Sequence, residues 1–229
     1  MKLAAILPAY NLEEEIQEIV ERTKQYSDIV IVVSDGSTDK TREAATKAGA
    51  LCPEETDKLG MGFAVRKGIE YSKQFKPDVV VLMDADGQHL PEEILKVIEP
   101  IMKENIDAVV GSRMMGVLRT SNINRIGNFG LKLISFLVTG RWLTDTESGF
   151  RAYKADKLYE LDLEADGYEI ESDLFLKSLH SGHSVKEVPI TVPKAVPGVT
   201  VIDGFKMGIF KIKLALKLRL FKEKKLKVM

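Results

Sequence analysis

The sequence predicts an α/β fold, a mostly parallel sheet with helices on both faces. Short apolar runs rich in β-branched residues alternate with segments of helical periodicity. Polar clusters follow several of these runs, where the carboxyl ends of parallel strands would lie. With 229 residues the chain can bury a sizeable core. We expect one domain over residues 1–203 and a basic amphipathic extension over residues 204–229.

Strand and helix alternate regularly up to residue 111. Strands are predicted at the short apolar runs, and helices where a capping residue, a glycine loop or a proline precedes helical periodicity. The predicted strands are residues 3–7, 29–33, 50–52, 79–83 and 107–111. Four helices are predicted: one that follows an Asn11 N-cap, one over 38–48, one from the glycine loop at 60–62 to residue 75, and one over 91–103.

The pattern after residue 111 is less regular. A loop from Arg113 is followed by an amphipathic helix at about 124–138 and a turn at 145–149. A helix at about 171–179 and a strand at 185–192 complete the elements that we expect. No internal repeat and no low-complexity segment interrupts them.

Charge is unevenly distributed along the chain. The formal net charge is -1, yet residues 204–229 hold nine Lys or Arg residues against one acidic residue, which leaves a net charge of -9 on the remainder. A basic tail on an acidic body favours contact with an anionic partner. A nucleic acid is disfavoured as that partner, because the basic charge is confined to the tail, where aromatic residues are sparse.

Asp84, Asp86 and Gln88 form the candidate site with the most specific chemistry. Two carboxylates one residue apart follow a buried strand, and Gln88 adds a neutral oxygen. Mg²⁺ and Mn²⁺ prefer such oxygen ligands, with phosphate oxygens completing the shell. The alternative is an ordinary Asp-Gly turn after a strand. We favour the metal site because the rest of the predicted sheet edge is also polar.

Two other loops at this edge allow both functional and structural interpretations. Asp35, in the segment 34–39, would bind a base or ribose, or the segment is a turn with a helix cap. Lys58 and the glycines at 60 and 62 would bring a cation and backbone N–H groups to a phosphate. The glycine loop lacks the Gly-Lys-Ser/Thr ending of a phosphate-binding Walker loop, so this signal is weak.

Taken together and in order, the motifs resemble those of family 2 glycosyltransferases with the GT-A (Rossmann-like) fold. More narrowly, they are similar to the branch of dolichyl-phosphate mannose synthases and polyprenyl-phosphate hexosyltransferases. The resemblance covers about residues 1–192. The motifs are Pro8-Ala9-Tyr10-Asn11, Asp35-Gly36-Ser37-Thr38-Asp39, the glycine loop, Met83-Asp84-Ala85-Asp86-Gly87-Gln88-His89, Gly111-Ser112-Arg113 and Asp145-Thr146-Glu147-Ser148-Gly149-Phe150-Arg151.

The resemblance implies a role for each matching residue. Asp84, Asp86 and Gln88 would hold Mg²⁺ or Mn²⁺. Arg113 and Arg125 would bind phosphate near the acceptor. Asp145 would be the catalytic residue, as a base for a hydroxyl acceptor or as an orienting group for a phosphate acceptor. The nucleotide-sugar contacts would be Pro8, Ala9, Tyr10, Val33, Asp35, Asp84, Ala85 and Asp86.

We therefore expect a metal-dependent, inverting transfer of a hexose from a nucleotide diphosphate sugar to a polyprenyl (dolichyl) phosphate. The donor would be GDP-mannose or a UDP-hexose. One alternative is the same fold acting on a soluble or glycan hydroxyl. Another is a nucleotide-sugar-binding protein with a degenerate site.

The tail and the cellular location follow from the same family context. Residues 210–220 alternate apolar and mostly basic residues, which is strand periodicity, yet Leu, Lys and Ala favour helix. We favour a basic helix at a membrane interface over a solvated or oligomer-forming extension. Cys52 is the single cysteine, no signal-peptide pattern follows Met1, and no apolar run reaches the roughly 20 residues that span a bilayer. We expect a cytoplasmic protein, peripheral at the cytoplasmic face of the membrane, without a transmembrane helix.

Overall fold

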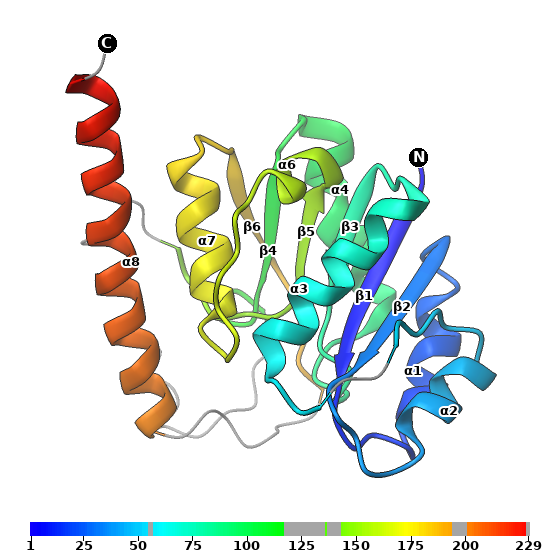
Figure 1. The fold of residues 1–229 in the computed structure, drawn as a ribbon. Helices are drawn as coiled ribbons and strands as arrows, with labels where there is room; N and C mark the ends of the chain where they lie inside the picture. Colours follow the sequence, from blue (N-terminus) through cyan, green and yellow to red (C-terminus); the bar gives the residue numbers. More distant parts are fainter. Residues whose placement is uncertain (55–56, 117–135, 137–142, 194–200, 228–229) are drawn as a thin grey trace.

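The described part of the chain is built around a six-stranded sheet (Figure 1). The computed structural model describes residues 1–54, 57–116, 136, 143–193 and 201–227. Along the sheet the strand order is β2-β1-β3-β5-β4-β6. The strands are β1 Leu3–Ala9, β2 Ile29–Ser34, β3 Val79–Leu82, β4 Ala108–Ser112, β5 Arg151–Lys154 and β6 Val185–Pro189.

All strands except β5 run in one direction, which confirms the mostly parallel sheet. β5 is antiparallel and lies between β3 and β4. It is not among the predicted strands, because four residues with a charge at each end carry almost no strand periodicity. The reversal places the first residue of β5 where its neighbours end: Arg151 pairs with Leu82 of β3 and with Val110 of β4.

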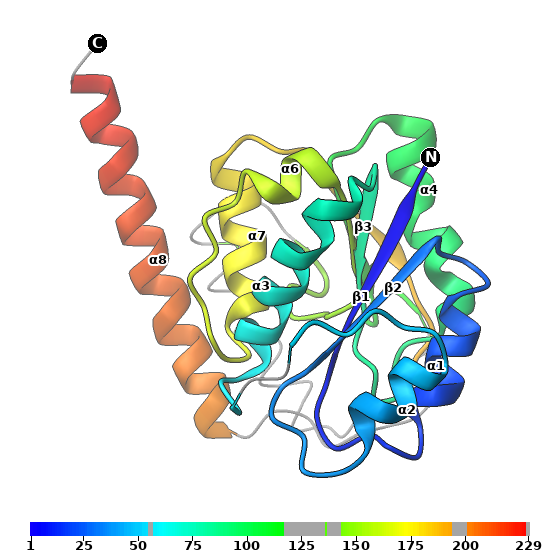
Figure 2. The ribbon, with the colours of Figure 1, turned by 45° about the vertical axis from the view of Figure 1, so that its right-hand side comes forward.

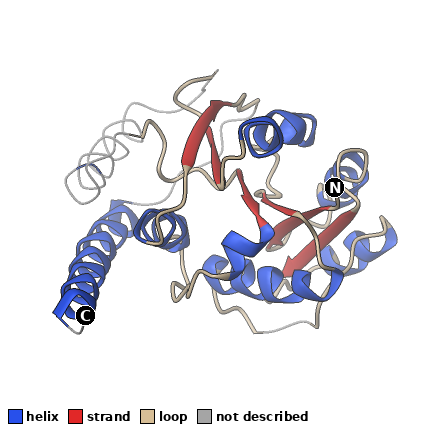
Figure 3. Ribbon diagram, turned by 90° about the horizontal axis from the view of Figure 1, so that it is seen from above, coloured by secondary structure: helices blue, strands red, loops and turns tan. Residues whose placement is uncertain are grey.

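Helices cover both faces of the sheet (Figure 3). Alternate side chains of β1 point to opposite faces, so Leu3, Ala5 and Leu7 belong to one apolar cluster and Ala4 and Ile6 to the other. The first cluster packs against α1 Ile16–Thr23, α2 Thr41–Lys47 and α4 Ile94–Glu104; the second packs against α3 Met61–Ser72, α6 Ala155–Tyr159 and α7 Ile170–His180. Short 3-10 turns at Lys73–Phe75 and Pro91–Glu93 follow α3 and precede α4.

The long C-terminal helix α8 Val201–Lys227 packs outside α7 and forms a further layer (Figure 2). The tail is therefore helical, and its strand-like alternation does not produce a strand. Leu214 is buried against Phe175 and Leu176 of α7. Among the described residues, no helix combines the length and the apolar character needed to cross a bilayer.

Two local predictions are wrong. Asn11 does not cap α1, which begins only at Ile16; instead its backbone is left-handed, with φ of 53°, and its side-chain oxygen accepts the N–H of Thr38 at 2.9 Å. This contact joins the loops after β1 and β2, an interaction between segments that are distant in sequence. The predicted strand at 50–52 is reduced to an isolated bridge between Leu51 and Ile31. The predicted helix at 124–138 lies outside the described residues.

Candidate active site

The candidate site lies at the edge where β1, β2, β3 and β4 end. Asp84 and Asp86 follow β3 directly. β1 has β2 on one side and β3 on the other. The chain that leaves β1 and the chain that leaves β2 therefore run in opposite directions along the sheet, and ligands of parallel α/β sheets bind at such a point. The reversed β5 brings residues 145–150 to the same edge. A Cβ atom on Gly149 would lie 2.4 Å from a carboxylate oxygen of Asp84, so a larger residue at this position would displace the Asp84 carboxylate.

Asp84 has an unusual electrostatic environment. Burial of its carboxyl group, together with the neighbouring carboxylates of Asp86 and Glu171, raises the pKa of Asp84 to about 8. Arg113 and Arg151 act in the opposite direction and offset only part of the effect. Two acidic side chains this close repel each other when both are ionised, and a divalent cation beside them would relieve the repulsion. The residues at this edge therefore fit a hard cation.

The described residues do not supply a complete metal shell by themselves. They contain no cluster of three or more His, Cys, Asp or Glu side chains that would hold a metal ion. Gln88 is tied to Asp86, since its backbone N–H donates to Oδ1 at 2.9 Å and its side-chain Nε2 to Oδ2 at 2.5 Å. These two hydrogen bonds use nitrogen atoms of Gln88, so its amide oxygen would be the side-chain atom available to a cation. Phosphate oxygens and water would complete the shell, as they usually do for Mg²⁺.

His89 accepts a hydrogen bond from the backbone of Asp84. Its Nδ1 accepts the backbone N–H of Asp84 at 3.2 Å, and its ring lies 5.1 Å from the ring of Phe150. Burial, with a further contribution from the charge of Arg113, lowers the pKa of His89 to about 3. His89 is therefore neutral at physiological pH and acts as a fixed hydrogen-bond acceptor for the turn that carries Asp84.

Asp145 is bound to Arg113 in a bidentate ion pair. Arg113 donates from Nε at 2.7 Å, from Nη2 at 2.9 Å and from its backbone N–H at 3.0 Å. Burial alone would raise the pKa of Asp145, but the charge and hydrogen bonds of Arg113, with a contribution from Arg151, hold it below its usual value. A carboxylate with a lowered pKa and three donors is a weak general base. The geometry thus gives Asp145 an orienting contact with Arg113.

Three charged residues that were not among the predicted site residues hold the loop around Asp145 in place: the partly buried Glu187 and the buried pair of Arg151 and Glu171. Glu187 of β6 accepts the backbone N–H groups of Thr144 and Asp145 at 2.7 and 2.8 Å. Arg151 is fully buried, paired with Glu171 at 2.5 Å, and donates to the carbonyls of Thr146 and Ser148 at 2.6 and 2.8 Å. Glu187 follows another charged residue, Lys186, in a mostly half-buried strand, so the sequence carried no clear signal for it, whereas Arg151 is the last residue of the Asp145–Arg151 motif.

Asp35 organises the glycine loop. Its two carboxylate oxygens accept the backbone N–H groups of Leu59 and Gly60 at 2.8 and 2.9 Å. The N–H groups of Gly62 and Phe63 at the start of α3 donate to the carbonyl of Asp166, at 2.8 and 3.2 Å. These N–H groups are therefore used within the fold, and the suggested phosphate contact by the glycine loop is not supported.

The remaining predicted nucleotide contacts differ in exposure. Tyr10 is exposed at the end of β1, with the ammonium of Lys58 3.6 Å from the centre of its ring. Ala9, Val33 and Ala85 have buried side chains, so their backbones rather than their side chains would meet a ligand. Pro8, on β1, is partly buried. Arg125 lies outside the described residues.

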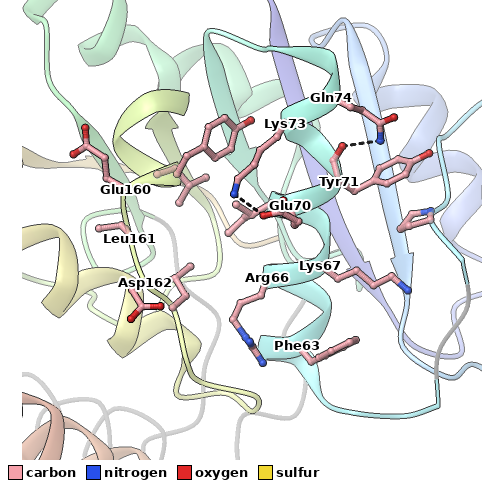
Figure 4. A pocket seen from close by; sticks show the side chains of 15 residues that line it. Phe63, Arg66, Lys67, Glu70, Tyr71, Lys73, Gln74, Glu160, Leu161 and Asp162 are labelled. Atoms are coloured by element: carbon pink, nitrogen blue, oxygen red, sulfur yellow. Dashed lines mark hydrogen bonds and ion pairs between the residues drawn. The ribbon is translucent and has the colours of Figure 1, made fainter.

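A surface groove lies elsewhere, between α3 and residues 158–163 (Figure 4). None of the predicted site residues lines it. Its basic side chains have partners: Lys73 pairs with Glu70, Arg66 with Asp166, and Lys67 donates to the carbonyl of Glu54. The groove is therefore not the site that the strand-end carboxylates form.

Comparison with known proteins identifies the family of this chain. Residues 4–162 match the family described as Glycosyl transferase family 2. An uncharacterized protein of Methanocaldococcus jannaschii is 39% identical, with 92% of this chain and 90% of that protein covered. A UDP-N-acetylglucosamine--dolichyl-phosphate N-acetylglucosaminyltransferase of Methanococcus voltae is 33% identical, with 88% and 91% covered. A polyprenol monophosphomannose synthase of Mycolicibacterium smegmatis is 31% identical, with 90% and 84% covered.

Solved structures show the same fold. Glucosyl-3-phosphoglycerate synthase from Mycobacterium tuberculosis, crystallised with Mn²⁺, UDP-glucose and phosphoglyceric acid, superposes with a TM-score of 0.76. The match covers 95% of this chain and 79% of that one at 20% identity. Because the family match covers residues 4–162, relatives of more than 30% identity are named as glycosyltransferases or synthases of this kind, and the fold is that of GT-A enzymes, this chain belongs to glycosyl transferase family 2 and is a glycosyltransferase.

Proposed function

We propose that the protein transfers a hexose, with inversion, from a nucleotide diphosphate sugar to a polyprenyl (dolichyl) phosphate. The donor is GDP-mannose or a UDP-hexose. The observation that carries the proposal is the pairing of Asp145 with Arg113 beside the Asp84 and Asp86 carboxylates. The choice of acceptor is supported by the relatives from M. voltae and M. smegmatis, which are named as a dolichyl-phosphate N-acetylglucosaminyltransferase and a polyprenol monophosphomannose synthase.

The donor would bind with its diphosphate at the end of β3. Asp84 and Asp86, with the Gln88 amide oxygen, are the residues that would hold Mg²⁺ or Mn²⁺ there. The ion would neutralise charge on the departing nucleoside diphosphate. Tyr10 and the backbone of Pro8, Ala9, Val33 and Ala85 would form the nucleoside side of the site. Asp35 would contribute through the loop that it holds in place.

The acceptor step follows from the state of Asp145. A phosphate monoester is already ionised at neutral pH and needs no strong base to attack the anomeric carbon. As the new bond between phosphate oxygen and sugar forms, the bond to the leaving diphosphate breaks. Asp145, held ionised by Arg113, would orient the guanidinium toward the acceptor phosphate. Arg125 is proposed as a second phosphate contact on sequence grounds alone.

The enzyme is proposed to act at a membrane surface, because the polyprenyl chain of its acceptor is held in a bilayer. The outer stripe of α8 consists of Phe205, Ile209, Ile212 and Leu216, which recur at helical spacing and are 39–71% exposed. The surrounding sequence is strongly basic. An apolar stripe with neighbouring cations suits the interface of a bilayer that contains anionic lipids.

The test is a panel of radiolabelled GDP- and UDP-sugars with polyprenyl phosphate and Mg²⁺ or Mn²⁺. We expect label to enter the organic phase with one donor, and chelation or Asp84→Asn to lower the rate by at least about 100-fold. Asp78→Asn, a matched change at the exposed start of β3, should leave the rate unchanged. Transfer only to hydroxyl acceptors, or nucleotide-sugar binding without turnover on any acceptor, would contradict the proposal.

A further inference from the structure

The C-terminal helix reaches the candidate active site through one buried charge. Lys211 of α8 is 0% exposed, and its ammonium forms an ion pair with Glu147. The same ammonium lies 3.1 Å from Oγ1 of Thr146. α8 begins at Val201, beyond the residues 4–162 that match the family, so this contact connects a segment outside the family match to the loop that carries Asp145.

Glu147 is the centre of a small polar cluster. Besides Lys211, it accepts the hydroxyl of Thr146 at 2.7 Å and the hydroxyl of Ser172 on α7 at 3.2 Å. Two residues further along, Gly149 lies directly against the carboxylate of Asp84. Two residues earlier, Asp145 holds Arg113. A shift at Glu147 would therefore be transmitted to both the carboxylate pair and the phosphate-facing arginine.

The Lys211–Glu147 ion pair differs from a second ion pair of α8, that of Lys217 with Glu164. Lys217 pairs with Glu164 at 2.5 Å, and both side chains are 41–49% exposed. Exposed pairs contribute little to structure, whereas a buried carboxylate that loses its partner is strongly destabilised and moves or takes up a proton. Lys211 and Lys217 lie on the same helix, so they provide a matched pair of positions, one that reaches the loop and one that does not.

We propose that Lys211 is a positioning residue for the transferase reaction: through Glu147 it holds the 145–151 loop against Asp84 and Arg113. α8 is thereby part of the active-site architecture, in addition to any contact that it makes with a membrane. The inference concerns the same site as the proposed function, and its kinetic test uses that reaction.

The kinetic test compares Lys211→Met with Lys217→Met. Displacement of reacting groups by about 1 Å costs roughly 100-fold in rate, so we expect Lys211→Met to lower kcat by roughly 10- to 100-fold with a smaller change in donor KM. Lys211→Arg, which retains the charge, should recover part of the loss. Lys217→Met should have the wild-type kcat. Equal kcat values for Lys211→Met and the wild type would overturn the inference.

A second measurement needs no substrate. Hydrogen–deuterium exchange followed by mass spectrometry should show faster exchange in the 145–151 peptide of Lys211→Met, and unchanged exchange there in Lys217→Met. If Lys211→Met does not fold, Lys211→Met/Glu147→Gln removes both charges together and should fold with the same local acceleration. Unchanged exchange in that peptide, in whichever variant folds, contradicts the inference. If the wild-type protein transfers no sugar to polyprenyl phosphate, the proposed function fails while the exchange result still decides the role of Lys211.

Discussion

At the scale of single residues, Asp84 shows how a binding function opposes stability. Its side chain is only 21% exposed, and this burial together with the charges of Asp86 and Glu171 raises the pKa of Asp84 to about 8. In the unfolded chain an aspartate titrates near 4, so between these values folding requires the uptake of a proton by Asp84. Without a metal ion, the Asp84 carboxyl group therefore destabilises the folded protein increasingly as the pH rises from about 4 to about 8.

Replacement of Asp84 by Asn should separate stability from activity. Because the raised pKa of Asp84 makes the folded state lose stability as pH rises from about 4 to about 8, Asp84→Asn should stabilise the metal-free protein relative to wild type at pH 8 and much less at pH 5. Thermal unfolding with a chelator at the two pH values measures this. A lower melting temperature for Asp84→Asn at pH 8 would show that the carboxyl group is not under electrostatic strain.

Metal binding should depend on pH for the same reason. A cation that displaces the proton from Asp84 binds more tightly as that proton is lost, so affinity should rise by up to about tenfold per pH unit below pH 8 and level off above it. Calorimetric titration with Mn²⁺ at pH 6.5, 7.5 and 8.5 tests the slope. An affinity independent of pH over this range would place the cation away from Asp84.

At the scale of elements, β5 and the loop before it assemble the site. In the antiparallel register Arg151 pairs with Leu82. Two positions beyond this pair, Gly149 and Asp84 therefore also lie opposite each other. The close approach leaves no room for a side chain at 149. The turn that carries Asp145 is held in position by β5 and by the hydrogen bond of its backbone N–H to Glu187 on β6.

Substitution of Gly149 by Ala should therefore damage the site. The added methyl group would lie 2.4–2.6 Å from both carboxylate oxygens of Asp84 and would displace them. We expect at least about a 100-fold loss of transferase activity, as for misplaced reacting groups. Gly204→Ala on α8 adds the same methyl group in open space and should keep full activity. Wild-type activity in Gly149→Ala would contradict the proposed placement of Asp84.

A second element-scale contact joins the other ends of β4, β5 and β6. Asp107 accepts from Lys154 at 2.8 Å and from the backbone N–H of Ser184 at 2.9 Å. Burial would raise its pKa, but these hydrogen bonds lower it to about 2. The stability that Asp107 contributes is therefore complete above about pH 4 and is lost as pH falls through about 2.

Asp107→Asn should cost about 1–3 kcal/mol of unfolding free energy at pH 7, because donors that faced a carboxylate lose their charged acceptor. The difference from wild type should shrink as the pH is lowered from 4 toward 2. Urea unfolding at several pH values measures it, with Asp156→Asn at an exposed surface position as the control. A pH-independent difference would exclude the ionised Asp107 carboxylate as its source.

At the scale of the whole molecule, α8 has two faces with different partners. Met207, Lys211 and Leu214 are buried toward α7 and the site, whereas Phe205, Ile209, Ile212 and Leu216 face outward. We propose that this outer stripe lies on a membrane surface, with the strand-end edge of the sheet accessible to lipid phosphate. The helix begins near that edge of the sheet (Figure 1).

Vesicle binding tests this arrangement. The protein should sediment with vesicles that contain anionic lipid, less with neutral vesicles, and less at ~0.5 M salt, where screening is strong. Ile212→Ser/Leu216→Ser should weaken binding, because it removes apolar area from the outer stripe. Leu95→Ser/Met102→Ser changes two similarly exposed apolar residues on α4 and should bind as wild type. Equal binding by both double variants would exclude α8 as the membrane contact.

The sequence by itself determined the features that are encoded locally. Apolar runs and helical periodicity predicted the alternation of elements, and the strand-end position of Asp84 and Asp86 predicted where the carboxylates gather. The order of the motifs predicted the family. These signals need only residues a few positions apart, since the periodicities of strand and helix and the geometry of a turn are local properties.

Only the tertiary structure decided the contacts that define the site's chemistry. Asp145 and Arg113 are 32 residues apart, and Lys211 and Glu147 are 64 apart. The short antiparallel strand β5 has too little periodicity to be predicted from the sequence, yet it places the 145–151 loop beside Asp84. Which buried charges pair depends on how strands and helices pack, because a side chain's partner is whatever the fold brings within hydrogen-bonding distance, and no local spacing records that.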